Sequence, residues 1–222
     1  MKDKTNDPER IYLASKEKDA DIHLLADIQN KLKKSRNVKF VLTGSYAIEA
    51  LTGQETYHED IDANILTDNI NDSLPKVASK ISHMSGLKVY KQTHNRLEYD
   101  VLPNIDRTDI KKLEFQFHEL DQKNDIPTVF ASLTDSKGKD FLFRVKSLPY
   151  VIATWSIRIS GLATNPLREL KVSDLEQFKL LLSCNHNVDD VLRLITNHPQ
   201  TPNGVIAVQI FEQSINKLQE MK

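Results

Sequence analysis

The chain has 222 residues, 39% of them hydrophobic, so it can bury a core of its own without disulfides. Its formal net charge of −1 excludes the overall basic field that attracts long nucleic acids. The single cysteine excludes an internal disulfide framework, and no apolar stretch is long enough to span a membrane. From these features we expect a cytoplasmic protein that does not associate with membranes.

The first part of the sequence alternates helical and strand patterns. Apolar residues spaced three and four apart predict a helix over 19–34, and an alternating run predicts a strand that ends at Gly44. A second helix should follow, with Ser45 as its N-cap and Gly53 as its C-terminal stop. Alternation over 60–66 predicts a half-buried strand with one acidic face, and a further helix should cover 71–84.

The later pattern changes from strands to helices. Strands are predicted over 87–90, 96–102, 112–117 and 141–145. After Pro149 the apolar spacing becomes helical, over 151–159, 172–182, 188–195 and 205–218. We therefore predict an α/β (α+β) fold, with a mixed-sheet domain over residues 1–148 and a helical C-terminal domain over 149–222.

The turn between the first strand and the second helix is suited to binding phosphate. Gly44 allows a tight backbone turn, and the helix after it presents unpaired N–H groups and the positive end of its dipole. The hydroxyl of Ser45 can donate a further hydrogen bond to the same phosphate. Gly44 and Ser45 are therefore the predicted nucleotide-binding residues.

Two carboxylates follow on the acidic strand. Asp60 and Asp62 are two positions apart, so their side chains leave the same face of a strand. Their mutual repulsion is relieved if divalent cations such as Mg²⁺ or Mn²⁺ bind between them, and Mg²⁺ is usually held by one or two carboxylates together with phosphate oxygens. A pair of such ions supports an in-line displacement at phosphorus.

A third carboxylate is expected on a later strand. If Leu113 and Phe115 face the core, Glu114 lies on the open face, and we select it as the third metal ligand. Asp100 on the preceding strand is the competing residue, because the register of the strands is not determined by the sequence.

Taken together, these residues resemble the polymerase-β-type nucleotidyltransferase superfamily. Its pattern is a Gly-[Gly/Ser] turn, an Asp-x-Asp strand and a third acid, matched here by Thr43-Gly44-Ser45, Asp60-Ile61-Asp62 and a later acidic strand position. The resemblance implies transfer of a nucleoside monophosphate from an NTP such as ATP. It assigns catalytic and metal-binding roles to Asp60, Asp62 and Glu114, and β/γ-phosphate binding to Gly44 and Ser45.

Two branches of that superfamily are similar to this chain. The run from Tyr46 to Asp60 resembles the Gly-Arg-x-Thr-Arg-x-His-x-Asp stretch of lincosamide and aminoglycoside nucleotidyltransferases, although it is one residue shorter and has Gln54 and Tyr57 in place of the arginines. The spacing from Gly44-Ser45 to Asp60 resembles AbiEii-type toxins, which also carry a helical C-terminal domain. Of their late Lys-Asp-x-x-Asp helix, only Asp174 is matched.

The branches imply different acceptors. The toxin branch implies an RNA or protein acceptor and an antitoxin partner, whereas the resistance branch implies a small-molecule acceptor, an antibiotic. A third alternative is a relative that binds nucleotide without catalysis.

Overall fold

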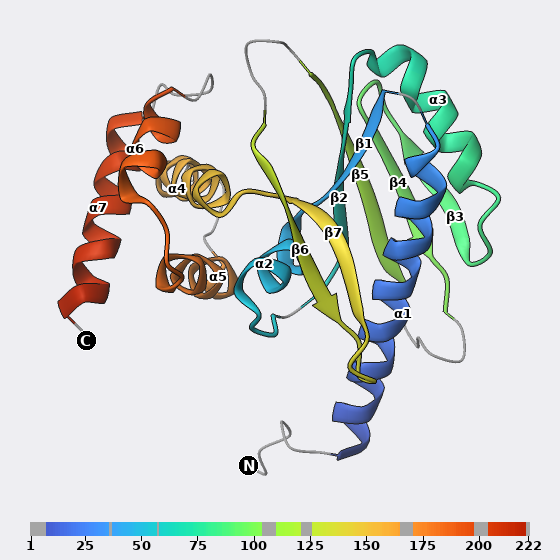
Figure 1. Ribbon diagram of the computed structural model, residues 1–222, viewed down its shortest axis with the longest axis horizontal. Coiled ribbons are helices and arrows are strands. Elements are labelled where there is room, and N and C mark those ends of the chain that lie inside the picture. The colour runs from blue at the N-terminus through green and yellow to red at the C-terminus, as the bar shows by residue number, and fades with distance from the viewer. Residues whose placement is uncertain are drawn as a thin grey trace. The chain divides into compact units, whose positions relative to one another are not determined.

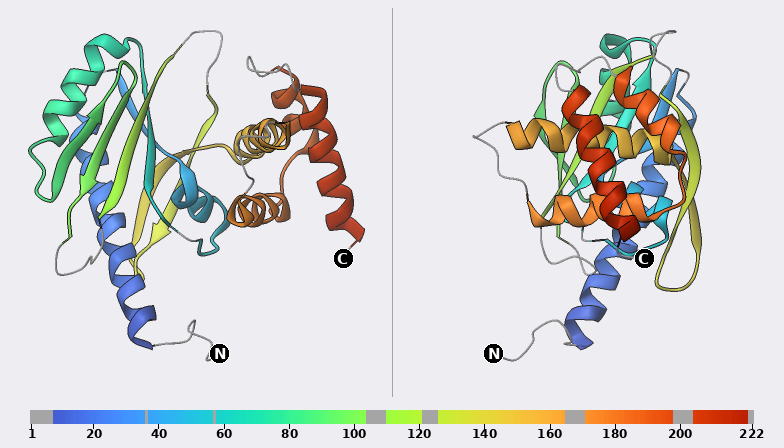
Figure 2. Two further views of the ribbon diagram at one scale, coloured as in Figure 1. Left: turned by 180° about the vertical axis from the view of Figure 1, so that it is seen from behind. Right: turned by 90° about the vertical axis from the view of Figure 1, so that its left-hand side faces the viewer.

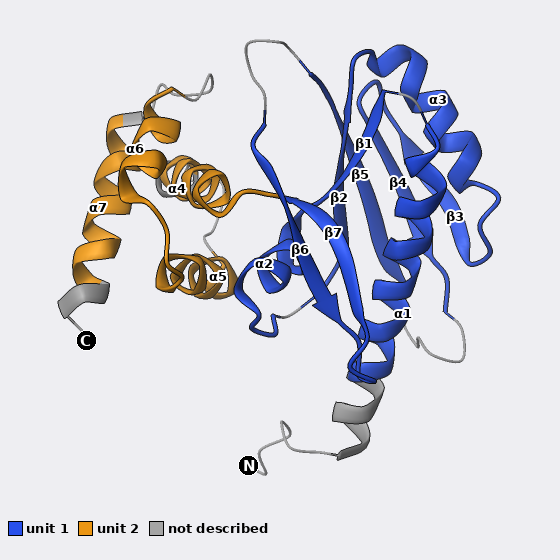
Figure 3. Cartoon of the chain, in the orientation of Figure 1, with its two compact units in different colours: residues 1–145 blue, residues 146–222 orange. Residues whose placement is uncertain are grey.

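The computed structural model describes residues 8–35, 37–56, 58–103, 110–120, 126–164, 171–197 and 204–220. The chain divides into two compact units, residues 1–145 and 146–222 (Figure 3). The predicted division after residue 148 lies close to this boundary. Each unit is considered by itself below.

Unit 1 is built on a mixed sheet, and seven strands of the described residues form it in the order β3-β4-β5-β2-β1-β7-β6 (Figure 1). Strand β2 pairs antiparallel with β1 and parallel with β5, while β4 pairs antiparallel with both β3 and β5. The strands are β1 (Val38–Leu42), β2 (Ile61–Thr67), β3 (Leu87–Gln92), β4 (Arg96–Val101), β5 (Lys111–Glu119), β6 (Thr128–Thr134) and β7 (Asp140–Lys146).

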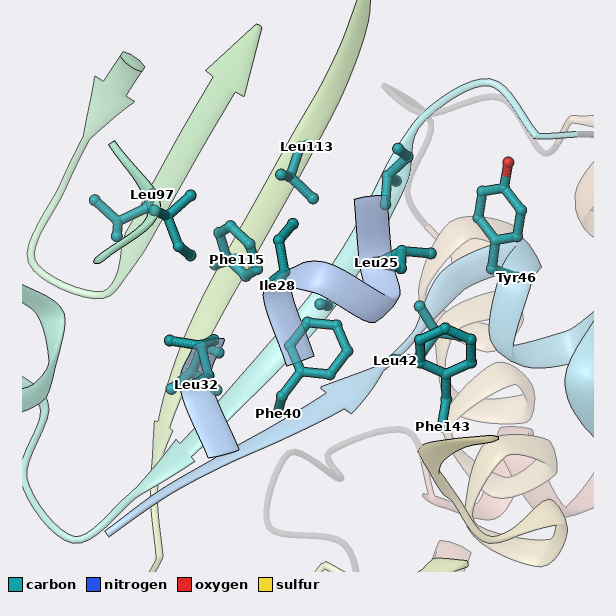
Figure 4. Packing of buried hydrophobic residues seen from close by; sticks show 14 of the residues in the cluster. Leu25, Ile28, Leu32, Phe40, Leu42, Tyr46, Leu97, Leu113, Phe115 and Phe143 are labelled. Atoms are coloured by element: carbon teal, nitrogen blue, oxygen red, sulfur yellow. The ribbon is translucent and has the colours of Figure 1, made fainter. Parts of the chain in front are cut away.

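Helices α1 (Pro8–Lys33) and α3 (Ile70–Ile81) lie on the same side of this sheet (Figures 1 and 2). The apolar stripe of α1 is fully buried, as predicted, against strand residues such as Phe40 and Phe115 (Figure 4). Helix α1 begins at Pro8, well before the predicted start at residue 19, and proline is favoured in a first helical turn. The core therefore occupies one face of the sheet, and the alternate strand residues point to the other face.

Helix α2 (Gly44–Thr52) connects β1 to the loop that leads into β2. It begins immediately after the turn at Thr43 and ends at Gly53, which adopts the left-handed conformation with φ of 67°. The end at Gly53 agrees with the sequence prediction, whereas the N-cap is Thr43 and not the predicted Ser45. Strand β6 was not predicted, and it forms one edge of the sheet.

Unit 2 is helical, as predicted, and its described residues form α4 (Leu148–Thr164), α5 (Val172–Ser183), α6 (Val188–Thr196) and α7 (Gly204–Glu220). Buried apolar side chains from all four helices, such as Ile152, Phe178, Ile195 and Phe211, form its interior. Among the described residues, none of the helices combines the length and the apolar character needed to cross a membrane.

Candidate active site

The turn from β1 into α2 brings a helix N-terminus next to the acidic strand. The backbone N–H of Thr43 donates to the carbonyl oxygen of Asp62 at 3.0 Å, and Gly44 then adopts a positive φ of 65°. Thr43 occupies the N-cap position, but its side chain makes no capping hydrogen bond. The N–H groups of the first turn of α2 point toward this end of the helix, and the helix dipole favours an anion there.

Gly44 and Asp62 are in direct contact. A Cβ atom built on Gly44 would lie 2.6 Å from Asp62 Oδ2 and 3.1 Å from Asp62 Cβ. Two independent requirements, the positive φ and this close approach, therefore select glycine at position 44. The contact holds the Asp62 carboxylate against the start of α2.

The strand register places Asp62 beside Glu114. In the parallel pair of β2 and β5, Asp62 lies opposite Glu114, and in the antiparallel pair of β4 and β5, Glu114 lies opposite Glu98. Cross-strand partners point to the same face, and adjacent strands are about 4.8 Å apart. Carboxylates from three neighbouring strands therefore lie side by side on the face opposite the core.

Asp60 immediately precedes β2, and Oδ1 of its carboxylate accepts the backbone N–H of Lys112 at 3.2 Å. Its charge affects Glu114. Burial raises the pKa of Glu114, Arg96 lowers it, and the charges of Glu98 and Asp60 raise it further. The net pKa is above the ordinary value, as expected for a carboxyl group close to other carboxylates.

Arg96 offsets part of this negative charge. Its Nε lies 3.2 Å from Glu114 Oε1, and Nη1 lies 3.7 Å from Glu98 Oε1. Asp100, the competing third carboxylate, lies opposite Lys112 in the register and forms an ion pair with the ammonium group of that residue. The structure thus brings Glu114 next to Asp62, whereas Asp100 is paired with a lysine.

Part of the chain that contains this site is similar in sequence to a known protein family. A model of the aminoglycoside-2''-adenylyltransferase family matches residues 12–120, the region that contains Gly44, Ser45, Asp60, Asp62 and Glu114. Among curated proteins, no sequence matches the chain.

Three solved structures have a similar fold. The antibiotic-resistance factor ANT(2'')-Ia is 15% identical over 91% of this chain and 96% of its own, with a TM-score of 0.53. An antigenic nucleotidyltransferase-like protein from Paracoccidioides brasiliensis is 14% identical over 90% of both chains, with a TM-score of 0.60. The nucleotidyltransferase toxin MenT4 from Mycobacterium tuberculosis is 12% identical over 90% of this chain and 82% of its own, with a TM-score of 0.54.

Residues 12–120 are thus similar to the aminoglycoside-2''-adenylyltransferase family, and the chain has the fold of solved nucleotidyltransferases such as ANT(2'')-Ia and MenT4. The predicted mixed-sheet nucleotidyltransferase fold is confirmed.

The carboxylates of this candidate site provide oxygen ligands of the kind that Mg²⁺ and Mn²⁺ prefer. Within the described part of the chain, no group of three or more His, Cys, Asp or Glu side chains is placed to hold a metal ion by itself. Mg²⁺ is commonly bound by one or two carboxylates together with substrate phosphates. Burial raises the pKa of Glu114, Arg96 lowers it, and the charges of Glu98 and Asp60 raise it further, so a cation beside these carboxylates would favour their charged forms. The residues therefore fit a metal bound jointly with a nucleotide.

Sequence reasoning missed the polar contacts around the loop between α2 and β2. His58 lies in this loop and is largely buried; its ring stacks on Tyr46 with a centroid distance of 3.6 Å and contacts Glu49 through Nε2 at 2.7 Å. Glu49 gave no signal in the sequence, because a single acid within a helix is usually a solvated residue. Only the folded chain shows that it faces the loop.

Proposed function

We propose that this protein is a metal-dependent nucleotidyltransferase that moves a nucleoside monophosphate from an NTP to an acceptor hydroxyl. The observation that carries the proposal is the pairing of Asp62 with Glu114 on the open face, with Asp62 in contact with Gly44 at the start of α2. A phosphate-binding helix end and a pair of carboxylates are thereby adjacent, as phosphoryl transfer requires.

Each group has a role in the proposed reaction. The first-turn N–H groups of α2 and the hydroxyl of Ser45 hold the β- and γ-phosphates. Asp60, Asp62 and Glu114 would bind Mg²⁺ or Mn²⁺, which would lower the pKa of the attacking hydroxyl and neutralise charge on the leaving pyrophosphate. The acceptor hydroxyl gives up its proton to solvent as its oxygen forms a bond to the α-phosphorus, the bond from the α-phosphorus to the bridging oxygen breaks, and pyrophosphate leaves with that electron pair.

Glu114 is proposed as the third carboxylate in preference to Asp100. Glu114 is the cross-strand neighbour of Asp62, and its side chain is 29% exposed, so it is accessible from the open face. Asp100 is opposite Lys112, which already neutralises it. Arg96 stands close enough to Glu114 to share its charge, so it influences how strongly a cation binds there.

The acceptor is proposed to be RNA or protein, as for a toxin of the AbiEii type with an antitoxin partner. A small hydroxylated acceptor such as an aminoglycoside is the alternative, and the match to the aminoglycoside-2''-adenylyltransferase family supports it. A relative that binds nucleotide without transferring it is the third reading, and it predicts no labelled product with any acceptor.

The test is incubation with each α-³²P-labelled NTP and Mg²⁺, in the presence of total RNA, total protein or a set of aminoglycosides. The double variant Asp60→Ala/Asp62→Ala should lose transfer. The matched control is Asp68→Ala, which removes an exposed acid at the far end of β2. Label on RNA or protein supports the toxin-like acceptor, and label on an aminoglycoside supports the alternative. Label that persists in the double variant would refute the assigned site.

A further inference from the structure

A group of polar side chains connects α1 and α2 with the loop that precedes Asp60. Glu49 lies at its centre and is only 9% exposed. Its carboxylate contacts Lys18 Nζ at 2.6 Å and His58 Nε2 at 2.7 Å, and it accepts the backbone N–H of Thr56 at 3.4 Å. These four residues are called the Glu49 clamp below. Two of its members, Thr56 and His58, belong to the loop itself.

The same loop is attached to the start of α2. The hydroxyl of Thr56 donates to the carbonyl oxygen of Ser45 at 3.0 Å. The ring of His58 stacks on Tyr46 with an interplanar angle of 3°, and the Tyr46 hydroxyl donates to the fully buried Asp21 at 2.6 Å. The loop is therefore held to the predicted phosphate-binding turn on one side, two residues before it delivers Asp60.

Apolar packing does not supply this attachment. Of the described loop residues 53–56 and 58–60, none is apolar, so the loop has little hydrophobic surface to bury. A cavity of about 170 Å³ is lined by Lys18, Thr56 and His58, among other residues, so the space beside the loop is not filled. The position of the loop therefore depends on the polar contacts of the Glu49 clamp, together with the hydrogen bond of Thr56 to Ser45 and the stacking of His58 on Tyr46.

Glu49 is charged in this environment. Burial works to raise the pKa of Glu49, but hydrogen bonds from His58 and Lys18 outweigh burial and lower the pKa below its ordinary value. A buried charge is tolerated only where its partners satisfy it, and in some proteins such groups fix a particular arrangement more than they add stability. Here the arrangement that they fix is the path of the chain into Asp60.

We propose that Glu49 is a positioning residue, which through Thr56 and His58 sets the place of the Asp60 carboxylate relative to Ser45. This inference rests on the proposed function, because it assigns to Glu49 an effect on the same transfer reaction. An error of about 1 Å in the position of a reacting group can reduce turnover about 100-fold, even when its source lies away from the chemistry.

The test compares Glu49→Ala and Glu49→Gln with Glu55→Gln. Glu55 contacts the same Lys18 at 3.2 Å but is 76% exposed and bonds to no loop amide among the described residues, so it is a matched control. We expect Glu49→Ala to lower kcat by about 10- to 100-fold, with a much smaller change in KM for the NTP. Glu49→Gln keeps one acceptor oxygen and should recover part of this loss, while Glu55→Gln should behave as the wild type.

Backbone hydrogen exchange gives a readout that does not depend on activity. Glu49→Ala should speed exchange in peptides covering 53–60 and leave the strands β1, β2 and β5 protected, whereas Glu55→Gln should change neither. Unchanged exchange in these peptides, or equal acceleration throughout unit 1, would overturn the proposal. If the wild type transfers no nucleotide, the proposed function fails, and the exchange comparison still decides whether Glu49 positions the loop.

Discussion

Replacing Gly44 with alanine tests the phosphate-binding turn most directly, because a second glycine provides an internal control. Gly44 and Gly53 flank the same helix and have nearly equal positive φ values, 65° and 67°. A Cβ at Gly44 would lie 2.6 Å from Asp62 Oδ2, whereas a Cβ at Gly53 would meet no atom within 4 Å. The two substitutions share the backbone strain and differ in the contact with Asp62.

The shared strain is modest. A left-handed conformation costs an L-residue about 1–2 kcal/mol, and the loss of about 1 kcal/mol lowers Tm by about 2–4 °C in a chain of this size. The shortest contact at Gly44 is with Asp62 Oδ2, which can move aside, whereas the 3.1 Å approach to Asp62 Cβ also requires a small shift of the strand. That movement displaces a proposed metal ligand, and we expect about a 100-fold loss of kcat for Gly44→Ala. Gly53→Ala should keep kcat within about threefold of the wild type, because it touches no part of the site.

The assay pairs thermal unfolding of both variants with the rate of NMP transfer measured well below either Tm. The expected result is a decrease in Tm for both variants, larger for Gly44→Ala, and a large loss of activity for Gly44→Ala alone. Equal activities for Gly44→Ala and Gly53→Ala would refute the reasoning, because the contact with Asp62 would then have no consequence for transfer.

Three further predictions concern the electrostatics of unit 1. Glu114→Gln should reduce the rate of transfer by about 10- to 100-fold and weaken Mn²⁺ binding, measured by electron paramagnetic resonance. Asp100→Asn should change neither the rate nor the binding. The opposite result would make Asp100 the third ligand. Arg96→Ala should lower the Mg²⁺ concentration that gives half-maximal thermal stabilisation by up to about fivefold, because Arg96 no longer competes with the metal for Glu114. A higher Mg²⁺ requirement in this variant would contradict the prediction. The pKa of Glu49 is lowered from its ordinary value of 4.5, so its stabilising effect is present above that pH and lost as pH falls through the lowered pKa. Urea unfolding should therefore show Glu49→Gln less stable than the wild type at neutral pH, with the difference shrinking in acid; a difference independent of pH would contradict the assignment.

Local patterns predicted most elements of unit 1, because the core face is well defined. The stripe of Ile22, Leu25, Ile28 and Leu32 predicted α1, and all four side chains are fully buried. The missed strand β6 carries a weaker pattern. Leu133 is buried, but the outward-facing Phe130 is 59% exposed at the edge of the sheet, so apolar residues occupy both faces and obscure the alternation.

The choice between Glu114 and Asp100 as the proposed third metal ligand depends on contacts between segments that are far apart in the sequence. Glu114 and Asp100 both lie on predicted strands with an open face, and only the parallel pairing of β2 with β5 places one of them opposite Asp62. Such pairing joins segments far apart in the chain, and a shift of one residue would exchange the faces. The contacts of Glu49 with Lys18 and His58 also join separate segments, so no spacing in the sequence could indicate them.

The two aspartates of the Asp-x-Asp motif are positioned by different means. Asp62 lies within β2, where pairing with β5 and contact with Gly44 fix its backbone and side chain. Asp60 precedes the strand, and in the described structure its carboxylate accepts the N–H of Lys112 while the Glu49 clamp holds the loop before it. A residue within a strand moves little, because its movement disrupts ladder hydrogen bonds on both sides. A residue at the end of a loop can move at a lower cost in free energy. Asp60 is therefore the ligand expected to adjust when metal and nucleotide bind, and Asp62 the one around which the site is built.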